Sequence, residues 1–293
     1  MSDSPAHVLV VGAGPTGLTL ACELQRRLGE PGEDAALDLR IVDREPAPHE
    51  HSRALGVHSR TLELLEDLEV LDPFLDEGRR LTAAHIHSDG AEIARVSFDD
   101  LEGPHPYVLS LPQSRTEHHL RQRLEALGGT VERSVRLDRL VEAEDRTAAV
   151  LVHADGREEV VRPDWIVGCD GAHSTVRAEL GLSFPGETWE ERFLLADARL
   201  EWELDDDDEF HTFLGESGLL VVIPLPGPLH RIVIDLPEGS SVPEPEMLRL
   251  TLLQDRMRSL GPAGAAVESV EWSSGFHIHR RMVSRFREGR VLL

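Results

Sequence analysis

Lysine is absent from this chain of 293 residues, because all 30 residues counted as Lys or Arg are arginines. No side chain can therefore form a Schiff base with a carbonyl substrate, which excludes the enzyme classes that depend on one. Aromatic residues make up only 4%, and Tyr107 is the single tyrosine. No apolar run approaches the roughly 20 residues of a membrane-spanning helix. The N-terminus lacks the basic-then-apolar pattern of a signal peptide, so we expect an intracellular protein.

Cysteine and positive charge are also scarce. The two cysteines, Cys22 and Cys169, make no disulfide framework and lack paired metal-ligand spacing, which favours a reducing compartment and a cytoplasmic location. Acidic residues number 54, and the formal net charge is -24. A surface of that sign repels nucleic acid and anionic membranes, so neither is an expected partner. The hydrophobic content of 40% is that of an ordinary globular protein.

A glycine-rich turn follows the apolar strand expected at residues 8–11. Its sequence is Gly12-Ala13-Gly14-Pro15-Thr16-Gly17, with G-x-G-x-x-G spacing. In a dinucleotide site, Gly12 makes the tight turn, Gly14 lets the backbone approach the pyrophosphate, and Gly17 lets the helix pack on the strand. The helix expected over residues 15–28 would present unpaired N–H groups to the phosphates. The alternative is a tight connection without a ligand.

The next apolar run supports the dinucleotide interpretation. Asp43 directly follows residues 39–42. Its carboxylate can accept hydrogen bonds from an adenosine ribose. The spacing from the glycine turn is long, and the Gly- and Pro-containing residues 29–34 account for it as an enlarged loop. These segments together predict one β-α-β unit.

The rest of the chain predicts an α/β fold: a Rossmann-like domain with a parallel sheet and an antiparallel hairpin, plus an interleaved antiparallel-sheet domain. We expect a helix over residues 116–127, capped by Thr116. A hairpin is expected through the turn at 154–157, followed by a buried strand at 165–168. Further strand-like segments are expected at 81–98, 107–111, 131–135 and 148–153, an antiparallel sheet over 187–236, a helix within 243–261 and a strand at 276–281.

A second motif follows the strand at 165–168. Asp170-Gly171, with Ser174 and Arg177 downstream, forms a D-G motif with S-x-x-R where a helix is expected to begin. With the glycine turn, this pattern resembles the FAD-dependent aromatic hydroxylases. These are the class A flavoprotein monooxygenases related to p-hydroxybenzoate and phenol hydroxylases, and the likeness is greatest to their polyketide-tailoring branch. Segments 52–63 and 111–117 match the family's pattern as well.

The resemblance implies FAD as the cofactor and a set of residues around it. Arg53 and Gln113 would contact FAD, and Arg44 matches a position near the pyrophosphate or the incoming reductant. A surface ion pair is the alternative for Arg44, and a helix cap is the alternative for Asp170. The full predicted cofactor-binding set is Gly12, Ala13, Gly14, Pro15, Thr16, Gly17, Asp43, Arg44, Arg53, Gln113, Val135, Asp170 and Gly171.

The resemblance also implies a reaction. NADPH or NADH would reduce FAD as a transient reductant, O2 would add to give a flavin C4a-hydroperoxide, and one oxygen would pass to an aromatic or polyketide-type small molecule. The expected FAD-binding domain comprises residues 1–80, 103–182 and 278–293, and the substrate domain residues 81–102 and 183–277.

One family fingerprint is missing. The G-D-x-x-H segment that follows a strand like residues 289–293 does not occur, so we expect an N-terminal piece of a larger hydroxylase. The alternative is an inactive FAD- or nucleotide-binding fragment of such an enzyme. Flavin halogenases are disfavoured because their lysine and W-x-W-x-I-P segment are absent, and a plain NAD-dependent dehydrogenase has no place for the D-G motif.

Several histidines and one arginine carry weaker hypotheses. His211 and Arg231 lie on strands expected near the substrate, but both are more often ordinary strand residues, and no catalytic residue is assigned. His277 and His279 share one face of a strand, yet they lack further ligands at zinc spacing, so no metal site is expected. The acidic run at 205–208 is expected to be a solvated hairpin tip.

Overall fold

The structure is a computed structural model that describes residues 6–27, 37–50, 54–142, 147–204, 208–237, 239 and 246–293. The chain divides into two compact units that alternate along the sequence. The first comprises Met1–Glu50, Ser114–Gly186 and Arg281–Leu293, and the second comprises His51–Gln113 and Glu187–Arg280. Within the described ranges, no helix is both long and apolar enough to cross a membrane.

The first unit is built on a six-stranded sheet of order β18-β19-β12-β1-β2-β8. The pairs β1–β2, β1–β12, β2–β8 and β12–β19 are all parallel, so the carboxyl ends of these five strands meet at one edge. The strands are β1 (Ala6–Val11), β2 (Leu37–Asp43), β8 (Val131–Arg133), β12 (Trp165–Gly168), β18 (Arg287–Glu288) and β19 (Val291–Leu292).

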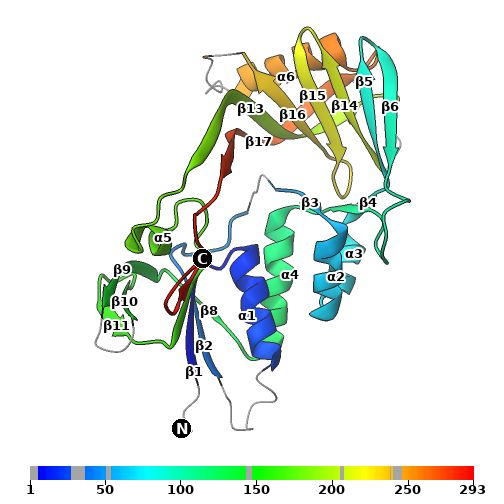
Figure 1. Cartoon of the computed structure of the whole chain (residues 1–293). Coiled ribbons are helices and arrows are strands. Elements are labelled where there is room, and N and C mark those ends of the chain that lie inside the picture. The colour runs from blue at the N-terminus through cyan, green and yellow to red at the C-terminus, as the bar shows by residue number, and fades with distance from the viewer. Residues whose placement is uncertain are drawn as a thin grey trace. The chain divides into compact units, whose positions relative to one another are not determined.

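Successive side chains of β1 point to opposite faces of this sheet, so its apolar residues pack on both faces. Leu9 and Val11 belong to a core shared with α5 (Thr175–Glu179) and with the antiparallel sheet of β9 (Arg136–Glu142), β10 (Thr147–Val152) and β11 (Glu158–Val161). On the other face lies α1 (Pro15–Arg27). It runs beside α4 (Gln113–Ala126) in Figure 1, and the Cys22 thiol donates to the Leu120 carbonyl at 3.3 Å.

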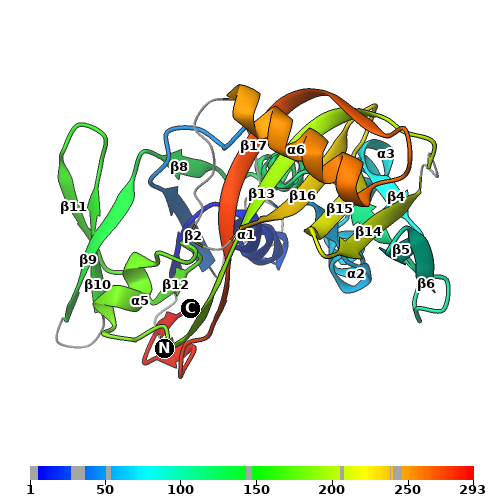
Figure 2. The ribbon, with the colours of Figure 1, turned by 90° about the horizontal axis from the view of Figure 1, so that it is seen from above.

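The second unit is built on a seven-stranded sheet of order β17-β13-β16-β15-β14-β5-β6. Its strands are β5 (Ala83–Ser88), β6 (Ala91–Ser97), β13 (Gly186–Glu201), β14 (Glu209–Gly215), β15 (Gly218–Pro224), β16 (His230–Leu236) and β17 (Ala266–Arg281). Helix α6 (Glu246–Leu260) lies across this sheet in Figure 2. Leu253 and Met257 of α6 pack with Val222 of β15 and Ile232 of β16 in one buried core.

A smaller sheet and two helices complete the second unit. The sheet has the order β3-β7-β4, with both pairs antiparallel. Its strands are β3 (Gly56–Val57), β4 (Arg79–Leu81) and β7 (Val108–Ser110), and the helices are α2 (Ser59–Asp67) and α3 (Leu71–Glu77).

The α/β class expected from the sequence is confirmed, with three local differences. The sheet over residues 187–236 is antiparallel from β13 to β14, but β14 then pairs in parallel with β5. Strand β9 was not expected, because its sequence, Arg-Leu-Asp-Arg-Leu-Val-Glu, carries four charged residues. Helix α4 begins at Gln113 rather than at Thr116, directly after Pro112.

Two expectations about segments need separate mention. The acidic run falls largely on residues 205–207, which lie outside the described residues, and Asp208 lies 3.9 Å from the Arg79 guanidinium. The compact second unit includes residues 51–80 and 103–113, which the sequence-based division assigned to FAD binding. That functional division stays a prediction.

Candidate cofactor site

Strand β1 leads the chain into the glycine-rich turn at the carboxyl edge of the six-stranded sheet. Gly12 has a φ of 103°, a left-handed conformation that favours glycine. A Cβ on Gly12 would lie 2.6 Å from the Cys169 carbonyl carbon, and one on Gly17 would collide with the Gly12 carbonyl oxygen. These two glycines therefore let the turn pack against β12 and let α1 begin against the turn.

Gly14 differs from both of them. A Cβ on Gly14 would meet no atom within 4 Å, so packing within the turn does not require glycine there. The open space lies at the start of α1, where Pro15 takes the first helical position and the first N–H groups have no partner inside the helix. A phosphate group could reach this backbone directly.

Asp43, the last residue of β2, lies beside this turn. Its Oδ2 accepts a hydrogen bond from the Ala13 N–H at 2.6 Å, and its Oδ1 accepts one from the Glu45 N–H at 2.8 Å. The side chain is 14% exposed, and each carboxylate oxygen retains a further lone pair for a ligand. Arg133 places its guanidinium 3.6 Å from Oδ1. Sequence reasoning missed Arg133, since only the pairing of β2 with β8 brings it here.

Asp170 follows β12 at the same edge. Its Oδ2 accepts hydrogen bonds from the N–H groups of Thr175 and Val176, at 2.6 and 3.2 Å, so the carboxylate caps α5. Its Oδ1 is buried and has no hydrogen-bond partner in the described part of the chain. A buried acceptor without a donor is costly, and this oxygen can accept a hydrogen bond from a bound group.

The S-x-x-R pattern downstream holds this loop in place. The Ser174 hydroxyl accepts a hydrogen bond from the Arg177 N–H at 3.0 Å. The Arg177 guanidinium donates to the Ala172 carbonyl at 2.8 Å and lies 4.5 Å above the Phe184 ring. Gly171 has a φ of 78°, which suits glycine at the turn. These residues fix the conformation of the segment that carries Asp170.

Four other predicted residues lie in different settings. The exposed side chain of Arg44 pairs with Glu45, with 3.3 Å between Nε and Oε1, which is the alternative weighed for it. Val135 is buried in the core, and its N–H donates to the Asp43 carbonyl at 3.0 Å. Gln113 belongs to the second unit, where its N–H donates to the Ala54 carbonyl at 3.2 Å. Arg53 lies outside the described residues.

Cys169 is the one thiol at this edge. Burial, and to a smaller extent the charge of Asp170, raise the pKa of Cys169 to about 11. A thiol with that pKa is protonated at neutral pH, and the thiolate is the reactive form. The role that the structure shows for Cys169 is to shape the turn, through its backbone contact with Gly12.

The second unit contains an apolar cavity of about 340 Å3. Its lining includes Leu81, Phe98 and Phe210, and among the described lining residues His58 alone carries an ionisable side chain. Ile223, also in the lining, is directly opposite Arg231 in the β15–β16 ladder, so both project from the same face of the sheet. The full lining is Leu55, Gly56, His58, Leu81, Phe98, Leu101, Val108, Phe210 and Ile223.

Arg231 and His211 project from opposite faces of the seven-stranded sheet. The buried Arg231 guanidinium donates to both carboxylate oxygens of Asp197, at 2.8 and 2.9 Å. His211 is paired in the ladder with Val222, on the face covered by α6. The structure thus shows Arg231 as a paired strand residue and places His211 away from the face of the apolar cavity.

Comparison with known proteins decides the family. The family model described as FAD binding domain matches residues 5–293. The chain belongs to this FAD binding domain family. FAD as the cofactor, predicted from the two sequence motifs, is thereby confirmed.

Several named proteins resemble the whole chain. It is 36% identical to 6-methylpretetramide 4-monooxygenase of Streptomyces rimosus, over 100% of this chain and 50% of that protein. It is 30% identical to pentachlorophenol 4-monooxygenase of Sphingobium chlorophenolicum, over 98% and 52%. The solved structure of OxyS anhydrotetracycline hydroxylase from S. rimosus matches with 30% identity and a TM-score of 0.72, over 98% and 55%. The chain spans about half the length of the curated relatives it matches.

The residues at the sheet edge fit FAD. Gly14 leaves the backbone open, and Asp43 holds a carboxylate beside the turn. Asp170 retains a buried acceptor that has no partner within the described ranges. A dinucleotide site needs a close approach of backbone to phosphate and an acidic acceptor for ribose. The first unit supplies both.

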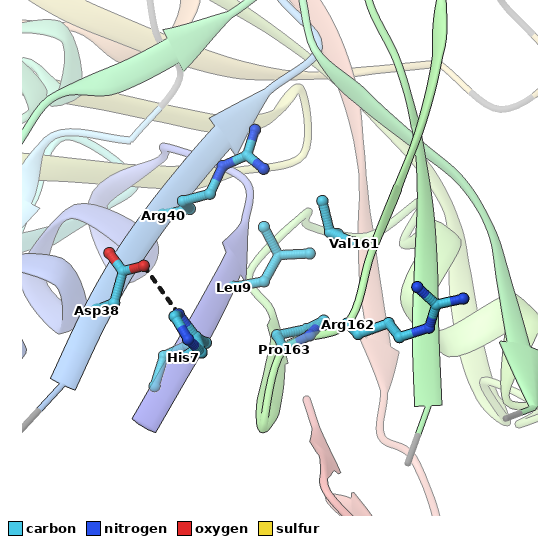
Figure 3. Close-up of a pocket in the computed structure, with 8 residues that line it drawn as sticks. His7, Leu9, Asp38, Arg40, Val161, Arg162 and Pro163 are labelled. Atoms are coloured by element: carbon cyan, nitrogen blue, oxygen red, sulfur yellow. Dashed lines mark hydrogen bonds and ion pairs between the residues drawn. The ribbon is translucent and has the colours of Figure 1, made fainter. Parts of the chain in front are cut away.

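A second hollow, of about 300 Å3, lies at the opposite end of β1 and β2 (Figure 3). His7 and Asp38 line it from neighbouring positions on β1 and β2, with 2.8 Å between Nδ1 and Oδ2. Arg40 is held by Glu132 at 2.7 Å and by Glu159 at 2.9 Å. Since these charged groups are engaged with one another, we assign no cofactor to this hollow.

Proposed function

We propose that this chain is part of an FAD-dependent monooxygenase that uses NADH or NADPH and O2 to hydroxylate an aromatic or polyketide-type small molecule. The observation that carries the proposal is the convergence of the glycine turn, Asp43 and Asp170 on one sheet edge. The relatives named above are monooxygenases of a chlorinated phenol and of a pretetramide, which supports this substrate class. Because the chain spans about half their length, the activity is proposed for the whole protein.

The two units take different tasks in this proposal. The first unit holds FAD, which when bound supplies the redox and oxygen-transfer chemistry. The turn at residues 12–17 holds the phosphates, Asp43 accepts hydrogen bonds from the ribose, and Asp170 accepts one through Oδ1. Arg44, Arg53, Gln113, Val135 and Gly171 remain proposed contacts of the cofactor.

The second unit provides the substrate site. A volume of about 340 Å3 is at the lower end of ligand pockets, which range over roughly 300–1,000 Å3. Leu81, Phe98 and Phe210 would exclude water from an apolar ring and contact it, while His58 offers one polar group. The sheet face beside it carries the buried Arg231–Asp197 pair. The two opposite charges cancel, so this pair adds no net charge to that face.

We also propose a cytoplasmic location. Both cysteines, Cys22 and Cys169, are free thiols, as is usual in a reducing compartment. The small-molecule substrate and O2 are the proposed partners.

The proposal is tested by oxygen-dependent oxidation of NADPH or NADH by the FAD-loaded protein, with and without a phenolic compound. We expect the phenol to stimulate oxidation, and isotopically labelled O2 to place one labelled oxygen in the product. Phe210→Ala should raise KM for the phenol by about tenfold, since it removes apolar contact area. Leu214→Ala, on the same strand outside the cavity lining, should leave KM unchanged. Stoichiometric FAD binding without oxidation would instead support an inactive flavin-binding fragment.

A further inference from the structure

Three histidines gather on the α6-covered face of the seven-stranded sheet. His85 and His87 are two residues apart on β5, and His211 on β14 is directly opposite His85 in the parallel ladder. Residues two apart on a strand share a face, so all three imidazoles project from the same side. The side chains come from positions 124 residues apart, which is why no sequence spacing revealed them.

The three rings lie within reach of one ion. One nitrogen from each of His85, His87 and His211 lies within 4.8 Å of the others, and Nε2 of His87 is 3.1 Å from Nδ1 of His211. A tetrahedral zinc ion at about 2.0–2.1 Å from each imidazole nitrogen holds its ligand atoms about 3.4 Å apart. Small side-chain rotations would bring this cluster to that geometry.

The cluster is shielded from water. His85 is 7% exposed and His211 is 2% exposed. The ring of Phe213 stacks on that of His87 with 4.5 Å between centroids, and the ring of Trp202 meets that of His211 edge-on at 5.4 Å. Such a shell restricts the access of solvent to a bound metal ion.

Two glutamates supply the remaining elements of a metal site. Glu92 places a carboxylate oxygen 2.8 Å from Nδ1 of His85, the arrangement that orients a ligating histidine from behind. One carboxylate oxygen of Glu209 contacts Nε2 of the same ring, and its other oxygen contacts Arg95. A metal bound at Nε2 of His85 would therefore meet the Glu209 carboxylate.

We propose that His85, His87 and His211 bind one divalent transition-metal ion, with Glu209 as the fourth ligand and zinc as the preferred ion. Imidazole nitrogen suits zinc, copper and nickel, whereas magnesium and calcium prefer oxygen ligands. The four protein ligands make a closed site, which is typical of structural zinc. The ion would link β5 to β14. Because β5 forms a hairpin with β6, it would also hold that hairpin against β14.

The proposal departs from the expectation of no metal site, and it is independent of FAD. His277 and His279 on β17 provide an internal comparison, since they also alternate on a strand with ring centroids 6.3 Å apart. Among the described residues, the one group of three or more potential ligands that could hold a metal ion is the cluster of His85, His87 and His211.

The test is calorimetric titration of the tag-free, EDTA-treated and dialysed chain with Zn2+, and separately with Mg2+. We expect one Zn2+ per chain, no heat from Mg2+, and a higher melting temperature with Zn2+ than without. His87→Gln should weaken zinc binding by at least about tenfold, because it removes a ligand. His87→Cys, which keeps a zinc ligand, should retain binding, and His279→Gln should bind as the unaltered chain does.

Two results would overturn the proposal. One is an unaltered chain that binds no zinc at micromolar concentration. The other is zinc binding that survives His87→Gln or Glu209→Gln but is lost in His279→Gln, which would place the ion on β17. Melting curves in EDTA show whether each variant is folded, and if His87→Gln is not, Glu209→Gln carries the comparison.

Discussion

The two ends of the six-stranded sheet carry similar residue types, but they differ in how far those residues are already paired with other groups of the protein. At the amino ends of β1 and β2, Asp38 pairs with His7 (Figure 3). Arg40 of β2 is held by two glutamates. At the carboxyl ends, Gly14 leaves open backbone, and Asp170 retains a buried acceptor without a partner in the described part of the chain. Both ends are polar, but the carboxyl end combines open backbone with a buried acceptor that is available to a ligand.

The difference shows that a hollow alone does not identify a binding site. The hollow at the amino ends has a measurable volume, yet His7 pairs with Asp38, and Arg40 is held by Glu132 and Glu159. The carboxyl edge is a site because parallel strands bring the ends of β1, β2 and β12 together. Four variants test this contrast, beginning with the largest expected effect.

Gly17→Ala should destabilise the protein most, by about 2–4 kcal/mol. The new Cβ would collide with the Gly12 carbonyl oxygen, so backbone atoms of the turn must move. Urea unfolding followed by circular dichroism measures the change. An unaltered unfolding midpoint would show that the turn is not packed as described.

Gly14→Ala should leave the unfolding midpoint unchanged and weaken FAD binding by at least about tenfold, or ~1.4 kcal/mol. A Cβ there meets no atom of the described residues within 4 Å but occupies the space that the pyrophosphate would approach. Fluorescence titration with FAD measures the affinity. Equal affinity in the variant would place the cofactor elsewhere.

Asp43→Asn should weaken FAD binding by about fivefold, or ~1 kcal/mol, because a charged acceptor for ribose becomes a neutral one. Asp38→Asn is the matched control, since it changes the same residue type on the same strand at the other end. We expect the control to bind FAD as the unaltered chain does. Equal losses in the two variants would point to a general effect of charge.

Arg40→Gln should have the smallest effect, about 0.5 kcal/mol of stability at neutral pH. Hydrogen bonding to Arg40 lowers the pKa of Glu159 to about 2, although burial opposes the shift. Because this folded-state pKa lies below the ordinary value of 4.5, the stabilisation is present above about pH 4.5 and is lost as the pH falls towards 2.

The control for that prediction is how the free energy of unfolding changes with pH in the acid range. In the variant, the pKa of Glu159 returns towards its ordinary value, so less stability is lost between pH 4.5 and pH 2. Urea midpoints measured across this range check it. Parallel profiles for the two proteins would show that the Arg40 network does not stabilise the fold.

The sequence predicted the local elements of the site well and the distant pairings poorly. The glycine turn, α1 and the acidic end of β2 follow from short-range patterns that turn geometry and helix periodicity determine. The start of α4 does not, because the Gln113 N–H is satisfied by the Ala54 carbonyl, a contact across nearly 60 residues of chain. Likewise, the parallel pairing of β14 with β5 alone brings His211 to His85.

For Asp170, the sequence predicted one part of the arrangement and missed another. The sequence placed it at a strand end and offered two roles, cofactor contact and helix cap. The structure shows the cap through Oδ2 and leaves Oδ1 without a hydrogen-bond partner among the described residues, so the cap is observed and the cofactor contact stays a prediction. Which oxygen performs which task depends on the three-dimensional path of residues 170–177, which no sequence pattern specifies.

The most direct test of FAD binding at this sheet edge is titration of the purified chain with FAD, followed by flavin fluorescence and visible absorption. We predict stoichiometric binding, one FAD per chain, with the absorption bands of a protein-bound flavin. A folded chain that leaves FAD fluorescence and absorption unchanged would contradict the account.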